Sequence, residues 1–119
     1  MKNLLAERAA LQHTITVYVP TTIGEKQMHP KSDEVAEMVD YVAKEMAKRH
    51  GGFTVTRGSG GWVNQAGETV HEPVYMVRSN LAEMDVTDTN HAVRIAEHVK
   101  DIMSQDLVSL EVDGTLYFI

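Results

Sequence analysis

Residues 32–56 read SDEVAEMVDYVAKEMAKRHGGFTVT, and this stretch predicts a helix that leads directly into a strand. Apolar side chains recur in it at helical spacing: Val35, Met38, Val39, Val42 and Met46. Ser32 suits the N-cap and Gly51-Gly52 supplies a left-handed stop, so we expect a helix over residues 33–50. The alternation from Phe53 to Thr56 then predicts a strand.

Two further strands flank this helix–strand unit. Residues 14–19 alternate, so Ile15, Val17 and Val19 are expected to face a core. A glycine-rich arm over residues 58–67 leads into a third strand over residues 70–77. Pro73 in that strand fits an unpaired position better than a central ladder position.

The second half of the chain repeats the pattern of a helix followed by a strand. Residues 90–104 carry an apolar face at 3.6-residue spacing: Ala92, Ile95, Ala96, Val99, Ile102 and Met103. Residues 108–112 alternate as a strand, and Asp113-Gly114 predicts a tight turn after it. The element order β-α-β-β-α-β predicts a ferredoxin-like α+β fold.

This fold predicts one domain over residues 1–119, with a four-stranded antiparallel sheet and two helices on one face. The first and third strands are expected at its centre. A short helix over residues 1–11 precedes the ferredoxin-like core of residues 12–119, which ends in a C-terminal β-hairpin. The expected hydrophobic core is Ile15, Val17, Val19, Val39, Val42, Met46, Phe53, Val55, Ile95, Val99 and Leu110. The open sheet face is expected to carry Thr14, Thr16, Tyr18, Thr54, Thr56, His71, Tyr75 and Val77.

Composition narrows the class of function. The 119 residues include 11 basic and 17 acidic side chains, and the formal charge of −6 disfavours a nucleic-acid partner. The absence of cysteine excludes disulfides, thiol catalysis and Cys-ligated zinc. No apolar run approaches the ~20 residues that cross a bilayer, and charge interrupts the N-terminus too early for a signal peptide. We therefore expect a cytoplasmic protein without a membrane partner.

Short motifs in the second and third strands resemble a family of small uncharacterised bacterial proteins. They are Gly52-Phe53 at the start of one strand, Gly58-x-Gly60-x-Trp62 in the arm, and Glu72-Pro73 in the next strand. The resemblance covers residues 13–119 and implies a ferredoxin-like α+β architecture. Because that family has no assigned function, it implies no catalytic residue.

The residues that could carry chemistry form no catalytic motif. Of the six histidines, His91 and His98 lie seven residues apart on one helix, too far to share an ion, so we expect no metal site and no cofactor. The run from Gly58 to Gly61 lacks the following helix of a phosphate loop, and Ser59 lacks a nucleophile elbow. We therefore assign no catalytic residue and favour a non-enzymatic role.

Three functions remain open. The first is a non-catalytic interaction or regulatory module that acts as a homodimer, with Tyr18, Trp62 and Tyr75 at or beside the contact. For Trp62, the alternatives are a lid over the sheet, insertion into a neighbouring subunit, and burial at the base of the arm. The second function is a small-molecule-binding protein or small enzyme that uses a cleft between the open face and the Trp62 arm. Its polar contacts would be Arg57, His71, Tyr75 and Arg78. The third is a phage- or plasmid-encoded inhibitor of a host protein.

Overall fold

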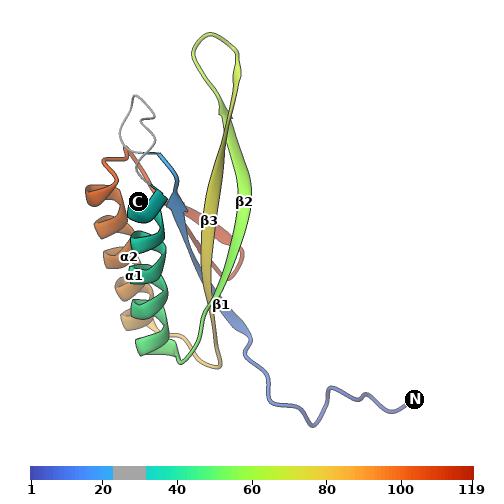
Figure 1. The fold of residues 1–119 in the computed structure, drawn as a ribbon. Coiled ribbons are helices and arrows are strands. Elements are labelled where there is room, and N and C mark those ends of the chain that lie inside the picture. Colours follow the sequence, from blue (N-terminus) through green and yellow to red (C-terminus); the bar gives the residue numbers. More distant parts are fainter. Residues whose placement is uncertain (23–31) are drawn as a thin grey trace.

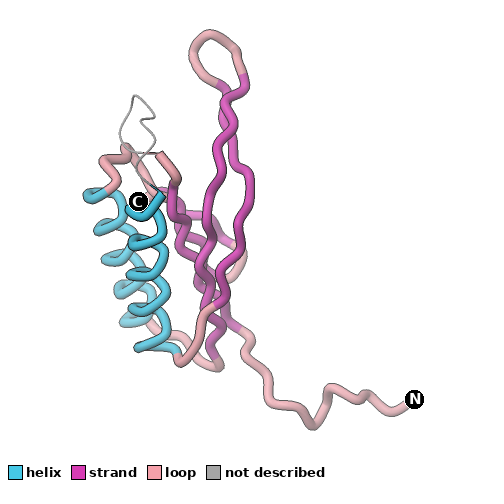
Figure 2. Tube along the Cα trace, in the orientation of Figure 1, coloured by secondary structure: helices cyan, strands magenta, loops and turns pink. Residues whose placement is uncertain are grey.

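The computed structural model describes residues 1–22 and 32–119. Its elements are β1 (His13–Pro20), α1 (Ser32–His50), β2 (Thr54–Val63), β3 (Thr69–Leu81), α2 (Val86–Ile102), β4 (Ser109–Val112) and β5 (Thr115–Phe118). Figure 2 shows how helix, strand and loop are distributed along the chain. Most of the loop expected between the first strand and the first helix lies outside the described residues, as does the side chain of the expected N-cap Ser32.

The strands form one antiparallel sheet in the order β2-β3-β1-β4-β5. The expected count of four strands is therefore wrong, because the Asp113–Gly114 turn folds the last residues back onto β4 as a fifth strand. Both turn residues have a positive φ, 50° and 85°, as a tight hairpin turn requires. The α+β fold is broadly compatible with the ferredoxin-like expectation, while strand count and order differ from it.

Both helices lie on the same side of the sheet (Figure 1). Helix α1 packs on β3 and β1, and α2 packs on β1 and β4. Most of the expected core is buried there, namely Ile15, Val17, Val19, Val42, Met46, Ile95, Val99 and Leu110, with Val39 partly buried against it. Phe53 and Val55 were expected in the core and are instead 51% and 38% exposed, because β2 is the edge strand beyond α1.

The first twelve residues do not form the expected helix. They contain only a turn, held by hydrogen bonds from Ala6 N to the Asn3 carbonyl (3.2 Å) and from Arg8 N to the Leu5 carbonyl (3.0 Å). All apolar side chains of the segment are exposed, including Leu4, Leu5 and Leu11. So short a helix needs a surface to dock on, and this segment has none in the single chain.

Strands β2 and β3 continue past the end of β1 as a two-stranded ribbon (Figure 1). We call its residues 60–72 the hairpin arm. Its strands are longer than expected, because the glycines pair within the ladder rather than form a loose tip. The Asn64 side chain accepts hydrogen bonds from the Ala66 and Glu68 backbone N–H groups at 3.0 and 2.9 Å, which fixes the turn. Trp62 is 42% exposed opposite Val70, so of its three alternatives burial at the arm's base does not occur.

Helix α2 begins earlier than the sequence predicted. Asp85 is its N-cap and forms a capping box with Asp88, so the helix starts at Val86 rather than at residue 90. The four extra residues bring the N-terminus of α2 against the C-terminus of α1, where Arg49 donates to Asp88.

Candidate functional site

The register of β3 decides which side chains share a face of the sheet. Tyr75 pairs with Val19 and Val77 pairs with Val17, and residues directly opposite each other in an antiparallel pair point the same way. Since Val17 and Val19 are buried under the helices, Tyr75 and Val77 point to the helix side as well. His71 lies an even number of residues before Tyr75 in β3, so it is on the same side. The expected placement of His71, Tyr75 and Val77 on the open face is therefore wrong.

The six candidate residues accordingly fall into two groups. By this register, three of them point to the helix side: Arg57, His71 and Tyr75. The other three point to the helix-free side: Tyr18, Trp62 and Arg78. The expected cleft between the open face and the arm therefore does not bring the four polar candidates together. The sequence did contain a signal for the correct alternation. Leu81, beyond the predicted end of the strand, is buried and shares the phase of Tyr75 and Val77.

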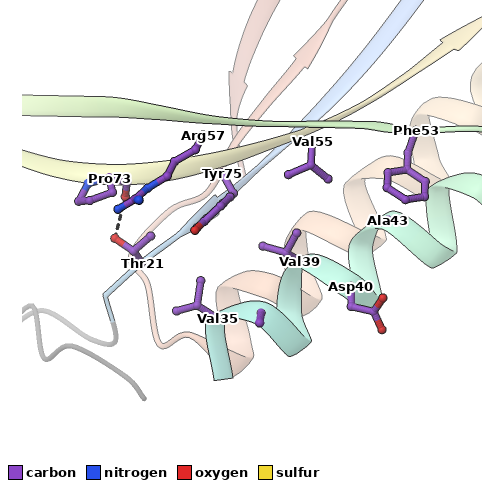
Figure 3. Close-up of a pocket in the computed structure, with 11 residues that line it drawn as sticks. Thr21, Val35, Val39, Asp40, Ala43, Phe53, Val55, Arg57, Pro73 and Tyr75 are labelled. Carbon is purple, nitrogen blue, oxygen red and sulfur yellow. Dashed lines mark hydrogen bonds between the residues drawn. The ribbon is translucent and has the colours of Figure 1, made fainter. Parts of the chain in front are cut away.

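A cleft of about 540 Å³ opens instead on the helix side (Figure 3). It exists because α1 sits over β3 and β1 and leaves the helix side of β2 uncovered. One wall is α1, which contributes Val35, Ala36, Val39, Asp40 and Ala43. The other wall and the floor are Phe53, Val55 and Arg57 with Thr21, Pro73 and Tyr75.

Arg57 and Tyr75 form the polar and aromatic end of this cleft. The Arg57 guanidinium carbon lies 5.9 Å from the centre of the Tyr75 ring, which is within the range of a cation–π contact. Beside them, the Thr21 hydroxyl donates to the Pro73 carbonyl at 2.7 Å (Figure 3). This bond ties the end of β1 to β3 and fixes the floor next to Arg57.

An acidic group lies toward the other end. Asp40 and Phe53 lie away from Arg57 in Figure 3. The Asp40 carboxylate pairs with Lys44 at 2.8 Å one helical turn away, and this hydrogen bond and attraction raise the pKa of Lys44. Both partners are exposed, so Asp40 can exchange Lys44 for a ligand at little cost. The cleft is therefore an apolar trough with a cation at one end and a carboxylate at the other.

A smaller hollow of about 280 Å³ adjoins this cleft and shares Arg57 and Pro73 with it. Its other lining residues are Gly58, Ser59, His71 and Glu72. The Glu72 carboxylate accepts a hydrogen bond from the Thr22 hydroxyl at 3.0 Å. The sequence patterns missed Asp40, Glu72 and the α1 wall as site residues, because nothing in the sequence reveals how far α1 is offset from β2.

Two negative findings apply to the described residues. Within residues 1–22 and 32–119, no group of three or more His, Asp or Glu side chains is arranged to hold a metal ion. No helix in that part of the chain is long and apolar enough to cross a membrane.

Comparison with known proteins bears on the fold of the chain. No family model and no curated protein matches the chain, so the resemblance to the bacterial family has no support beyond the α+β fold. A solved structure described as a phage SAM lyase in complex with S-methyl-5′-thioadenosine is 19% identical, with a TM-score of 0.60 over 97% of this chain and 95% of that chain. A phage SAM lyase in the apo state is 18% identical, with a TM-score of 0.61 over 97% and 94% of the two chains. At such identities the chain shares the fold of these phage proteins.

Proposed function

We propose that the chain binds S-adenosylmethionine in the cleft between α1 and β2 and cleaves it as a lyase. One observation carries the proposal. An apolar trough of nucleoside size, with a guanidinium at one end, lies in a fold that matches a phage SAM lyase along nearly the whole chain.

The lining of the cleft matches the parts of this ligand. A volume of about 540 Å³ lies within the usual ~300–1,000 Å³ range of small-molecule sites. Phe53, Val55 and Val39 offer apolar surface for an adenine ring. Arg57 offers paired N–H donors for the methionine carboxylate, and the Tyr75 ring face attracts a cation such as the sulfonium. Asp40 would accept hydrogen bonds from the ribose hydroxyls.

The reaction consists of one carbon–sulfur bond cleavage. The bond between sulfur and Cγ of the methionine chain breaks, and sulfur keeps the electron pair, which neutralises the sulfonium and releases S-methyl-5′-thioadenosine. The methionine carboxylate supplies the new bond when it attacks Cγ, so the four-carbon unit leaves as a lactone. Atoms and charge balance without added water. The protein's part is then to hold the carboxylate in line with the Cγ–S bond and to exclude water.

A second candidate function is a phage-encoded inhibitor that binds a host protein directly. The observation that favours it is that both structural neighbours are phage proteins. Lyase activity would also act against the host, since it removes the methyl donor that methyltransferases need. For either function, lyase or direct inhibitor, we propose a cytoplasmic location.

The test is incubation of the purified full chain with S-adenosylmethionine, followed by mass spectrometry of the products. We expect S-methyl-5′-thioadenosine and the four-carbon lactone in equal amounts. Arg57→Ala is expected to lower kcat/KM by about 10- to 100-fold, as the loss of a hydrogen-bonded charge does. Arg94→Ala, exposed on α2, is the matched control and should leave kcat/KM unchanged.

Two outcomes would count against the lyase. Binding of S-adenosylmethionine without turnover would overturn the enzyme and favour the small-molecule-binding alternative. The absence of both binding and turnover would leave the direct inhibitor or a non-catalytic module.

A further inference from the structure

The turn between β4 and β5 contains the dipeptide Asp113–Gly114, whose residues have φ values of 50° and 85°. An aspartate followed by glycine is prone to a reaction of its own backbone, in which the glycine nitrogen attacks the aspartate Cγ and closes a succinimide ring. Glycine favours this attack because it has no Cβ to hinder the approach. No other aspartate or asparagine of the chain precedes a glycine, so the reaction is specific to this turn.

Both oxygens of the Asp113 carboxylate are held by the start of β1. Oδ1 accepts a hydrogen bond from the Thr14 backbone N–H at 2.8 Å, and Oδ2 lies 2.7 Å from Nδ1 of His13. An N–H group at a carboxyl oxygen stabilises the negative charge that develops there when a nucleophile attacks the carbon. A protonated imidazole at the other oxygen supplies a proton to a leaving group. Asp113 Cγ is therefore prepared for attack from both sides.

The attacking nitrogen has a base beside it. The Gly114 backbone N–H donates to Oε1 of Glu111, and the same oxygen accepts from the Thr14 hydroxyl at 3.3 Å. A carboxylate that already accepts this N–H can take its proton as the nitrogen attacks. The Asp113 N–H also donates to the Thr14 carbonyl at 3.0 Å, so backbone bonds fix the turn against β1. Nucleophile, base, electrophile and acid are thus held in one place.

We propose that Asp113 and Gly114 form a self-modification site, at which the surrounding groups convert the aspartate into isoaspartate. First, the bond from Gly114 N to Asp113 Cγ forms. At the same time Glu111 takes the amide proton, and His13 protonates Oδ2. Then the Cγ–Oδ2 bond breaks with its electron pair on oxygen. The proton on Glu111 reaches that oxygen through solvent, and water departs.

Solvent water completes the conversion. The side chains of His13 and Asp113 are 36% and 37% exposed, so water reaches the succinimide. When water attacks the carbonyl of the original main chain, the bond from this carbonyl to nitrogen breaks, and the released proton returns to His13. The chain then runs through Cγ, and the added Cβ lengthens the turn. We expect the pairing of β4 with β5 to loosen as a result.

The same bonds would also hold the hairpin if they had no chemical role, and the two roles predict opposite results. A turn that is merely rigid isomerises more slowly in the folded chain than in the unfolded chain. A catalytic arrangement exists only in the folded chain and acts faster there. None of the four residues lines the cleft, so this proposal does not depend on the proposed function.

The test is incubation of the purified full chain at neutral pH, once folded and once in concentrated urea. Peptide mapping with mass spectrometry separates the isoaspartyl peptide from the aspartyl peptide and gives both rates. We expect conversion about tenfold faster in the folded chain, which is a modest effect for general acid and base catalysis. Conversion that is slower in the folded chain than in urea would overturn the proposal.

Two variants identify the groups responsible. Glu111→Gln keeps an acceptor for the Gly114 N–H and removes the base, whereas His13→Gln keeps a donor for Asp113 and removes the acid. Each should slow the folded-state reaction by about tenfold and leave the rate in urea unchanged, with an unaltered far-UV circular dichroism spectrum. Glu97→Gln, exposed on α2, is the matched control and should change neither rate. A folded-state rate that either turn variant leaves unchanged would refute the assignment.

Discussion

Arg49 joins the two helices where the C-terminus of α1 meets the N-terminus of α2. Its Nε donates to Asp88 at 2.8 Å and its terminal nitrogen donates to the Thr87 hydroxyl at 2.8 Å. The backbone bond within the capping box, and then Arg49, lower the pKa of Asp88. The same carboxylate therefore caps α2 and holds the C-terminus of α1.

Beside this ion pair, His50 of α1 meets His91 of α2 with ring centres 6.1 Å apart. Nε2 of His50 and Nδ1 of His91 are buried, and neither has a hydrogen-bond partner among the described residues. Burial is the main cause that lowers the pKa of both rings from 6.5. Arg49 adds to the lowering for both, while Asp88 opposes it, joined at His91 by Glu45. The folded state therefore favours two neutral histidines.

This pair predicts a loss of stability in mild acid. Between pH 6.5 and the lowered pKa values, the unfolded chain binds protons that the folded chain does not, so the free energy of unfolding falls as the pH falls. Urea unfolding at pH 7.5 and 5.5 measures it. The variant His50→Gln with His91→Gln should show a weaker pH dependence than the natural chain, whereas His71→Gln, exposed on the arm, should not.

The carboxylates with lowered pKa values do not affect the comparison of stability at pH 7.5 and 5.5. The lowered pKa values of Asp85, Asp88 and Asp113 make their stabilisation disappear only as the pH falls below about 3.8. Equal pH dependence in the natural chain and the double histidine variant would refute the assignment.

At the scale of elements, the hairpin arm depends on a close backbone approach at Gly61. A Cβ at this position would lie 2.7 Å from the Val70 carbonyl oxygen, closer than any real contact allows. Gly61→Ala is therefore expected to force the two strands of the arm apart while the sheet under the helices stays intact. Hydrogen exchange should become at least tenfold faster over residues 60–72 and remain unchanged in β1.

Gly52→Ala is the matched control for this variant. A Cβ at Gly52 meets nothing within 4 Å, and the residue does not have a positive φ. Its exchange pattern should equal that of the natural chain. Slow exchange in the arm of Gly61→Ala would mean that the strands tolerate the contact.

Helix faces are local properties, and the sequence predicted them well. Val42 and Val99 were assigned to the core from their 3.6-residue period alone, and both are fully buried. The face of Tyr75 was predicted wrongly because alternation within residues 70–77 is ambiguous, and Leu81, which shares its phase, lies beyond the predicted end of the strand. In the structure, pairing with β1, more than fifty residues away, fixes this face. The cleft was missed for a similar reason, since it arises from the offset between α1 and β2 rather than from any motif.

At the scale of the whole molecule, the first eleven residues bury no side chain against the described part of the fold. Their apolar side chains are exposed, and the start of β1 is held separately by the Asp113 carboxylate, which bonds to the His13 ring and accepts from the Thr14 N–H. Deleting residues 2–11 should change the free energy of unfolding by less than about 0.5 kcal/mol, the usual range for surface changes. Urea unfolding of the shortened chain measures this, and a loss above 1 kcal/mol would mean that the segment docks on the fold.

Alternation along β3 has a consequence for how this chain can vary in length. Tyr75 lines the cleft, and its neighbour Met76 points to the opposite face of the sheet. One residue inserted between Pro73 and Val77 would therefore move every side chain beyond it to the other face. The length changes that this strand tolerates are therefore insertions or deletions of two residues, or of one residue that forms a β-bulge. The turn from Asn64 to Glu68 is free of that restriction, because it lies where the ladder ends. A peptide tag or reporter loop inserted at this turn would lengthen the arm's tip without altering either surface.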